Sequence, residues 1–145
     1  MNKFAMMMMI CALPALTLPA AAETSIKPGQ WKVTAKTRMN GAAMPPRVKP
    51  RCLTPEQAGD LGKTFGPEMG AVNSTCERTQ FEAADQTLKW RMQCKGQLDM
   101  DVAADFNFDS PTHYTATVVS KAWMAGAQIN DVITELEGEH IGECQ

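Results

Sequence analysis

The sequence predicts a single mainly β domain, a curved antiparallel meander or barrel-like sheet with one short helix and two disulfides. Three observations predict this fold class: apolar and polar residues alternate in several segments, turn dipeptides separate these segments, and four cysteines follow an apolar leader. Alternation with a period of two is typical of strands that bury one face. It is clearest in residues 97–108, whose apolar side holds Leu98, Met100, Val102, Ala104, Phe106 and Phe108.

The first 22 residues have the pattern of a secretory signal peptide. Seventeen of them are apolar, Lys3 precedes the apolar stretch, and residues 20–22 are the small alanines of a cleavage site. We expect cleavage after Ala22, export to the periplasm or beyond the cell, and one domain over residues 23–145. After the leader, no apolar run approaches the roughly 18 residues of a membrane-spanning helix, so we expect no membrane span.

Cysteine usage predicts two disulfides. Cys11 leaves with the leader, and four cysteines are an even set in a small exported domain. Cys76 and Cys94 flank a predicted hairpin, which places them opposite each other and leaves Cys52 to pair with Cys144. The main alternative joins Cys52 to Cys76 and Cys94 to Cys144. A bridge that closes a long loop stabilises a fold by about 2–4 kcal/mol.

The exported part begins with a strand and a tight turn. Residues 30–39 alternate, with Trp31 on one face and basic side chains on the other. Asn40-Gly41 favours a two-residue hairpin turn, because both residues tolerate a positive φ. Residues 48–53 follow as an edge strand, since Pro50 has no N–H to donate to a sheet.

A short helix is predicted after Thr54. Thr54 can cap the helix, Pro55 suits its first position, and Gln57 can complete a capping box. We expect the helix to end near Leu61. Residues 62–74, which begin with glycine and contain a Gly-Pro dipeptide, are expected to form a loop.

The remaining chain is predicted to form successive antiparallel strands. Pairing Cys76 with Cys94 in the first hairpin sets Arg78 and Gln80 on its apolar face, and a β-bulge near Phe81 or a different strand pairing would resolve this conflict. The expected strands are residues 75–82, 87–95, 97–108, 113–124 and 128–137, with 138–144 as a short strand or tail. The expected turns are residues 83–86, 109–112 and 125–126.

Charge is distributed unevenly along the chain. Residues 23–95 hold 12 basic and seven acidic side chains, whereas residues 96–145 hold one basic side chain, Lys121, and nine acidic ones. We interpret this asymmetry as attraction between neighbouring strands. A surface that orients a charged partner is the alternative. The near-neutral total gives no support for nucleic-acid binding.

Several segments together resemble a known family. They are residues 27–34 (KPGQWKVT), 39–46 (MNGAAMPP), 52–56 (CLTPE), 90–96 (WRMQCKG) and 141–144 (IGEC). In this order and spacing, the chain is similar to bacterial exported proteins grouped as domain of unknown function 3617. The resemblance covers essentially the whole exported part and implies an extracytoplasmic, largely β protein with paired cysteines. It implies no activity and no catalytic residues.

Three aspartates are candidate calcium ligands. Asp99, Asp101 and Asp105 alternate on one face of residues 97–108, and calcium takes several oxygen ligands. Successive carboxylates on a straight strand lie roughly 7 Å apart, so they do not converge on one ion. We favour a solvated strand face that lies opposite the basic residues of 30–39.

Methionine offers a second metal chemistry, because converging thioethers select Cu(I). Six methionines follow the leader: Met39, Met44, Met69, Met92, Met100 and Met124. Their dispersed spacing favours packing roles. We therefore expect no metal site and no cofactor, and we keep a periplasmic copper- or calcium-handling protein as the alternative function.

Catalytic motifs are missing from the sequence. His113 and His140 are the only histidines, and neither lies in a recognisable hydrolase, phosphate-loop or zinc motif. We therefore predict a non-enzymatic protein with no catalytic residues.

Among the functional interpretations, a ligand pocket has the clearest structural basis, because a curved sheet of six to eight strands can nearly close around a small molecule. The candidate lining residues are Trp31, Trp90, Met100, Phe106 and Phe108. These side chains could instead simply fill the interior, which is the favoured reading. We predict an exported, non-enzymatic periplasmic protein that binds a small apolar molecule or contacts an envelope partner.

Overall fold

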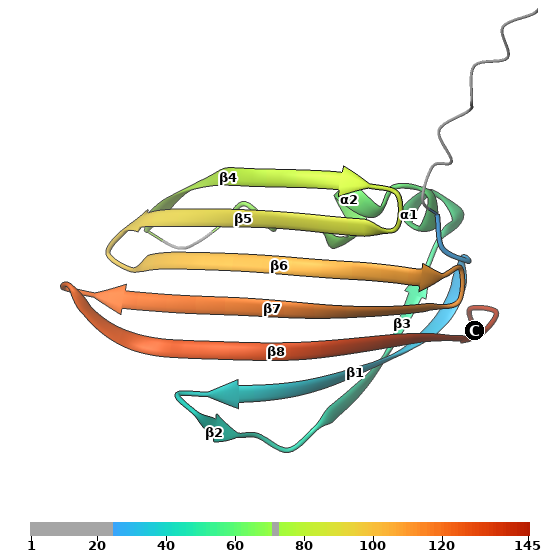
Figure 1. Cartoon of the computed structure of the whole chain (residues 1–145), viewed down its shortest axis with the longest axis horizontal. Coiled ribbons are helices and arrows are strands. Elements are labelled where there is room, and N and C mark those ends of the chain that lie inside the picture. The colour runs from blue at the N-terminus through green and yellow to red at the C-terminus, as the bar shows by residue number, and fades with distance from the viewer. Residues whose placement is uncertain (1–24, 71–72) are drawn as a thin grey trace, which may run out of the picture.

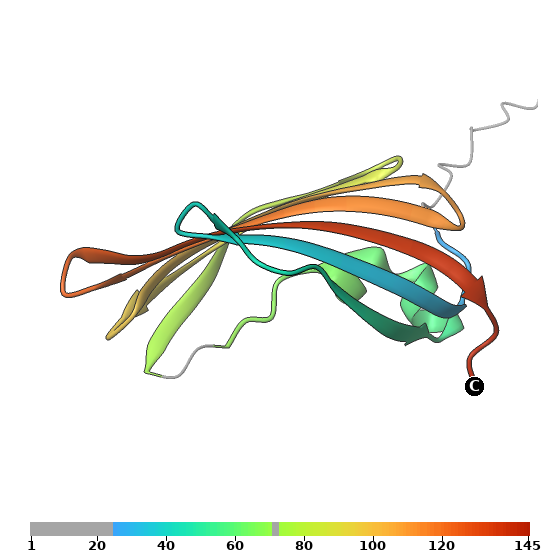
Figure 2. The ribbon, with the colours of Figure 1, turned by 90° about the horizontal axis from the view of Figure 1, so that it is seen from below.

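The computed structural model describes residues 25–70 and 73–145, so the predicted signal peptide at residues 1–22 lies outside the described part. Over this part, one antiparallel sheet of eight strands carries the fold, and two short helices lie on one of its faces (Figures 1 and 2). The mainly β fold class is confirmed. The sheet is curved but open. The fold contains two helices, whereas the sequence predicts one.

The strand order is β2-β1-β8-β7-β6-β5-β4, and β3 pairs with β1. Strands β4 to β8 form the predicted meander, while β1, from the other end of the chain, pairs with the last strand (Figure 1). The strands are β1 (Gly29–Met39), β2 (Ala42–Ala43), β3 (Arg47–Leu53), β4 (Ser74–Ala84), β5 (Thr87–Gly96), β6 (Asp99–Ser110), β7 (His113–Met124) and β8 (Ala127–Gly142). The expected break of the last strand at residue 138 is wrong, because β8 is continuous.

The tight turns form where the sequence predicts them. Asn40 and Gly41 have φ values of 49° and 82°, and Ala125 and Gly126 have φ values of 49° and 79°. Two successive residues with positive φ match the right-handed twist of the strands that they join. These turns therefore fix the register of the β1–β2 and β7–β8 hairpins.

The predicted β-bulge is present in β4, two residues earlier than expected. Cys76 pairs with Cys94, the register shifts between Arg78 and Gln80, and Phe81 then lies opposite Trp90. The extra residue brings Phe81 onto the apolar face and turns Gln80 to the other face. The bulge thus removes the conflict at Gln80, whereas Arg78 stays opposite Met92 on the apolar face, where its guanidinium lies over the Phe81 ring.

Two helices replace the single predicted one. α1 (Pro55–Gly59) begins with the expected capping box, in which Gln57 N donates to Thr54 Oγ1 over 3.2 Å. α2 (Leu61–Phe65) lies inside the segment predicted as a loop. It forms because the Asp60 carboxylate accepts a hydrogen bond from Lys63 N at 2.9 Å and so caps a new helix.

The helices cover one face of the sheet, which we call the inner face; the opposite face is the outer face (Figure 2). Phe65 of α2 packs against Phe106, Phe108 and Tyr114, with ring centroids 5.2–5.4 Å apart. The Trp90 indole N–H donates to the Phe65 carbonyl oxygen at 2.8 Å. Helices of five residues are unstable alone, so this packing holds them in place.

Tyr114 shows how closely the inner face is packed. It lies opposite Gly138 in the β7–β8 pair, and a side chain at position 138 would overlap the Tyr114 ring. The glycine therefore provides the space that the aromatic ring fills. Burial raises the pKa of the Tyr114 phenol above its ordinary value of 10.0.

The structure contains both predicted disulfides. Cys76–Cys94 joins the neighbouring strands β4 and β5, and Cys52–Cys144 ties β3 to the end of the chain. Among the described residues, no helix is long and apolar enough to cross a membrane.

Candidate functional site

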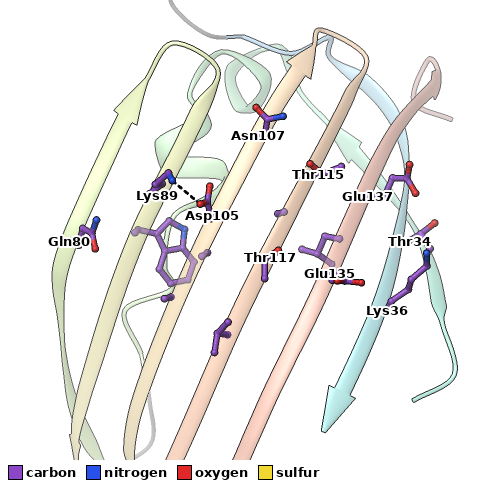
Figure 3. A pocket seen from close by; sticks show the side chains of 16 residues that line it. Thr34, Lys36, Gln80, Lys89, Asp105, Asn107, Thr115, Thr117, Glu135 and Glu137 are labelled. Carbon is purple, nitrogen blue, oxygen red and sulfur yellow. Dashed lines mark ion pairs between the residues drawn. The ribbon is translucent and has the colours of Figure 1, made fainter. Parts of the chain in front are cut away.

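A groove of about 770 Å³ crosses the outer face (Figure 3). Its floor is made of short side chains: Thr115, Thr117 and Val119 of β7 and Ala103 of β6. The longer side chains of Asn107 and Glu137 flank Thr115, and those of Asp105 and Glu135 flank Thr117, so the middle of the face is lower than its rim. The methyl groups of the short side chains give the floor apolar character.

Charged residues form the rim of the groove. On one side, Lys89 Nζ lies 2.8 Å from Asp105 Oδ2, and this contact raises the pKa of Lys89 above its ordinary 10.5 (Figure 3). On the other side lie Lys36, Glu135 and Glu137. Lys36 and Glu135 are direct neighbours in the β1–β8 register. They form no ion pair in the described structure, so both charges face solvent.

His113 holds one end of this rim. Its Nδ1 lies 2.7 Å from Asp109 Oδ1, and its Nε2 lies 3.2 Å from Glu137 Oε1. These hydrogen bonds, helped by the charges of both carboxylates, raise the pKa of His113 above 6.5. A protonated ring donates from both nitrogens, so it fixes Glu137 beside the groove.

The three candidate calcium ligands are each paired with a cation of β5. Asp101 accepts a hydrogen bond from Arg91 Nε at 2.8 Å, Asp99 lies 3.0 Å from Lys95 Nζ, and Asp105 meets Lys89. Hydrogen bonds from these partners lower the pKa values of Asp99 and Asp101 below the ordinary 3.8. The carboxylates are therefore neutralised separately and do not converge.

The expected partner strand of these aspartates is wrong. The neighbours of β6 are β5 and β7, whereas β1 pairs with β8, so Lys32 of β1 contacts Glu139 instead. The broader interpretation of the charge asymmetry is confirmed, since Lys32, Lys89 and Arg91 of the basic part pair with carboxylates of the acidic part on adjacent strands.

The second histidine, His140, contacts the segment that precedes β1. His140 donates from Nε2 to the Pro28 carbonyl oxygen at 3.0 Å and lies edge-on to Trp31. Within residues 25–70 and 73–145, no group of three or more His, Cys, Asp or Glu side chains is arranged to hold a metal ion.

The five candidate ligand-lining residues lie on the inner face. Phe106, Phe108 and Trp90 are buried against Phe65 of α2, Trp31 is buried against Tyr114, and Met100 is partly buried further along β6. Of the five, Trp90 also lines the groove. An interior cavity lined by these side chains stays a prediction, and the groove is a separate hollow on the opposite face.

Sequence reasoning missed the groove because no motif marks it. Its residues come from six strands, and most occupy the polar positions of the alternating pattern. One signal was available: Thr115, Thr117 and Val119 are successive outward positions of β7, and all are short and uncharged. The neighbouring strands carry charged residues at many of their own outward positions.

The described residues form a small β protein with one open antiparallel sheet and two disulfides, and this architecture gives the class of the protein. The family described as protein of unknown function (DUF3617) matches residues 26–144, so the chain belongs to this family, as the resemblance implied. The comparisons with curated proteins and with solved structures gave no match.

Proposed function

We propose that this chain is an exported periplasmic protein without enzymatic activity, and that it binds a small molecule with an apolar body in the outer-face groove. The groove carries the proposal. Its volume of about 770 Å³ lies within the range of small-molecule sites, roughly 300–1,000 Å³. The floor offers methyl groups to an apolar body, and the charged rim can orient the polar end of a ligand.

The placement of the ligand differs from the sequence-based expectation. The sequence favours the aromatic side of the sheet, but Phe106 and Phe108 are held there by Phe65 of α2 and by each other. Trp31 is fully buried on the same side and packs against the Tyr114 ring. The outer face has no such cover among the described residues, because the helices lie on the other side (Figure 2). We therefore place the ligand on the outer face.

Native mass spectrometry of protein purified from the export compartment tests the binding proposal. We expect an additional mass that is released on denaturation. Thr117→Trp fills the middle of the groove and is expected to abolish that mass. Thr75→Trp is the matched control, because Thr75 is also an exposed outer-face threonine but lies outside the groove. Absence of any bound mass, or equal retention by both variants, would overturn the proposal.

Export is supported by the apolar leader and by two disulfides, which persist in oxidising compartments. N-terminal sequencing of the protein recovered from the periplasm tests this part. We expect the chain to begin at Glu23. A chain that keeps its leader or stays in the cytoplasm with free thiols would contradict export.

A further inference from the structure

A second cavity adjoins the groove at the β2 edge of the sheet. It has a volume of about 510 Å³ and lies between β1, β8 and the segment that leaves β2. Lys36 and Glu135 line both hollows, so the two lie side by side. The cavity has an apolar wall formed by Ala43, Met44, Pro46 and Ile133.

This apolar wall is unusually open to solvent. Met44 is 42% exposed and Ile133 is 41% exposed. Large apolar side chains that gather at an exposed surface usually mark a place of contact with another molecule. The segment is held in shape, since Met44 N donates to the Thr37 carbonyl oxygen at 2.8 Å and prolines follow it.

The cations of this cavity are also unusual. Seven Lys or Arg side chains project from strands of the outer face: Lys32, Lys36, Arg38, Lys89, Arg91, Lys95 and Lys121. Five of them form ion pairs with carboxylates. Lys36 and Arg38 are the two without such a pair in the described structure, and both line this cavity. Two unpaired cations beside an apolar wall suit a ligand that is negatively charged at one end and apolar elsewhere.

Glu135 limits the charge of that ligand. It lies directly opposite Lys36, so the cavity holds two cations and one carboxylate. A single negative charge balances this set, whereas a headgroup with several negative charges would meet repulsion from Glu135. The cavity volume fits one small molecule and not a lipid surface.

We infer that this cavity holds the headgroup end of the ligand, and that the ligand is a free, single-chain amphiphile with one negative charge, such as a carboxylate. Lys36 and Arg38 bind the anionic group. The apolar chain packs on Met44, Pro46 and Ile133 and continues into the groove. This inference rests on the proposed function, because it names the class of the ligand that occupies the groove and the adjoining cavity.

Calorimetric titration of the exported, oxidised protein tests the charge requirement, after bound molecules have been removed. The probes are decanoate, decan-1-ol and decyltrimethylammonium, which share one chain and differ in charge. We expect decanoate to bind at least tenfold more tightly than either of the others. Equal affinities for decanoate and decan-1-ol would overturn the inference.

Two double variants test the site. Lys36→Gln with Arg38→Gln is expected to weaken decanoate binding at least tenfold. Arg47→Gln with Lys49→Gln is the matched control, because it removes the same two charges from β3, whose Arg47 and Lys49 line neither hollow. Its affinity is expected to stay within twofold of the wild type. Equal effects of both double variants would overturn the inference.

Glu135→Gln sharpens the test, because it acts in the opposite direction. Removing the competing carboxylate is expected to tighten decanoate binding severalfold, and weaker binding would contradict the role assigned to Glu135. The test separates the two proposals. If Thr117→Trp removes a co-purified molecule while replacement of Lys36 and Arg38 leaves the affinity for decanoate unchanged, the proposed function stands and this inference fails.

Discussion

The inner and outer faces of the sheet differ in composition and in what holds their side chains. The inner face is aromatic and aliphatic, no Asp or Glu of β1 to β8 points to it, and its charges are the edge-strand cations Arg47, Lys49, Arg51 and Arg78. The outer face holds the strand carboxylates and nearly all of the ion pairs. Packing thus fixes one face, while the other stays open to solvent.

The largest expected effect comes from the bridge that lies outside the packed face. Cys52 and Cys144 are exposed and 92 residues apart, whereas Cys94 is fully buried. Replacing both Cys52 and Cys144 by alanine is expected to lower the free energy of unfolding by about 4.5 kcal/mol, because a long loop regains its chain entropy. Urea unfolding measures this loss.

Mild reduction of the native protein gives a second measure of the same contrast. We expect the exposed Cys52–Cys144 bridge to open before Cys76–Cys94, as shown by alkylation and peptide mapping at increasing dithiothreitol concentrations. Earlier opening of Cys76–Cys94 would show that burial of Cys94 on the inner face does not protect this disulfide from reduction.

Two adjacent residues of β7 compare the faces directly. Tyr114 is buried against Phe65 and Gly138, whereas Thr115 is exposed in the groove. Tyr114→Ala is expected to lower the free energy of unfolding by about 3–5 kcal/mol, since it leaves a cavity. Thr115→Ala is expected to change it by less than about 0.5 kcal/mol. If chemical unfolding showed similar losses of unfolding free energy for both variants, the conclusion that packing stabilises the inner face but not the outer face would be refuted.

The ion pairs of the outer face are expected to stabilise the fold only weakly. Asp101→Asn breaks the contact with Arg91 and is expected to cost about 1 kcal/mol or less, because the pair is solvated. The loss should shrink further in 1 M salt, which screens exposed charges. A salt-independent loss above about 2 kcal/mol would mean that this face is packed as tightly as the other.

The smallest effect is a pH dependence from His113. Its pKa is raised in the folded state by Asp109 and Glu137, so its contribution is fully present below about pH 6.5. The contribution is lost as the pH rises through the raised folded pKa. We expect less than about 1 kcal/mol between pH 6 and pH 9. His113→Gln should flatten this part of the curve of unfolding free energy against pH.

Features set by neighbouring residues were predictable from the sequence. The Asn40-Gly41 turn, the capping box at Thr54 and the hairpin that joins Cys76 to Cys94 depend on residues close together in the chain. α2 was missed because Gly62 resembles a helix end. Gly62 is required instead by the nearby ring of Phe81, and a side chain there would crowd that ring.

The long-range strand pairing and the groove could not be predicted from residues that are close together in the chain. β1 meets β8 across roughly 100 residues, and that pairing decides that Lys32 faces Glu139 and not an aspartate of β6. The groove depends on the same pairing, because Thr34 and Lys36 reach it only from β1. Alternation assigns each residue to a face but does not identify its neighbour on that face.

The open sheet also has a consequence for self-association. Each free edge of a sheet can template a strand from another molecule, and successive additions would build a polymer. On β3, Pro50 has no N–H to offer to an incoming strand, and on β4 the bulge between Arg78 and Gln80 interrupts the regular edge. These two irregularities oppose filament growth, so the chain can leave its outer face uncovered without closing into a barrel.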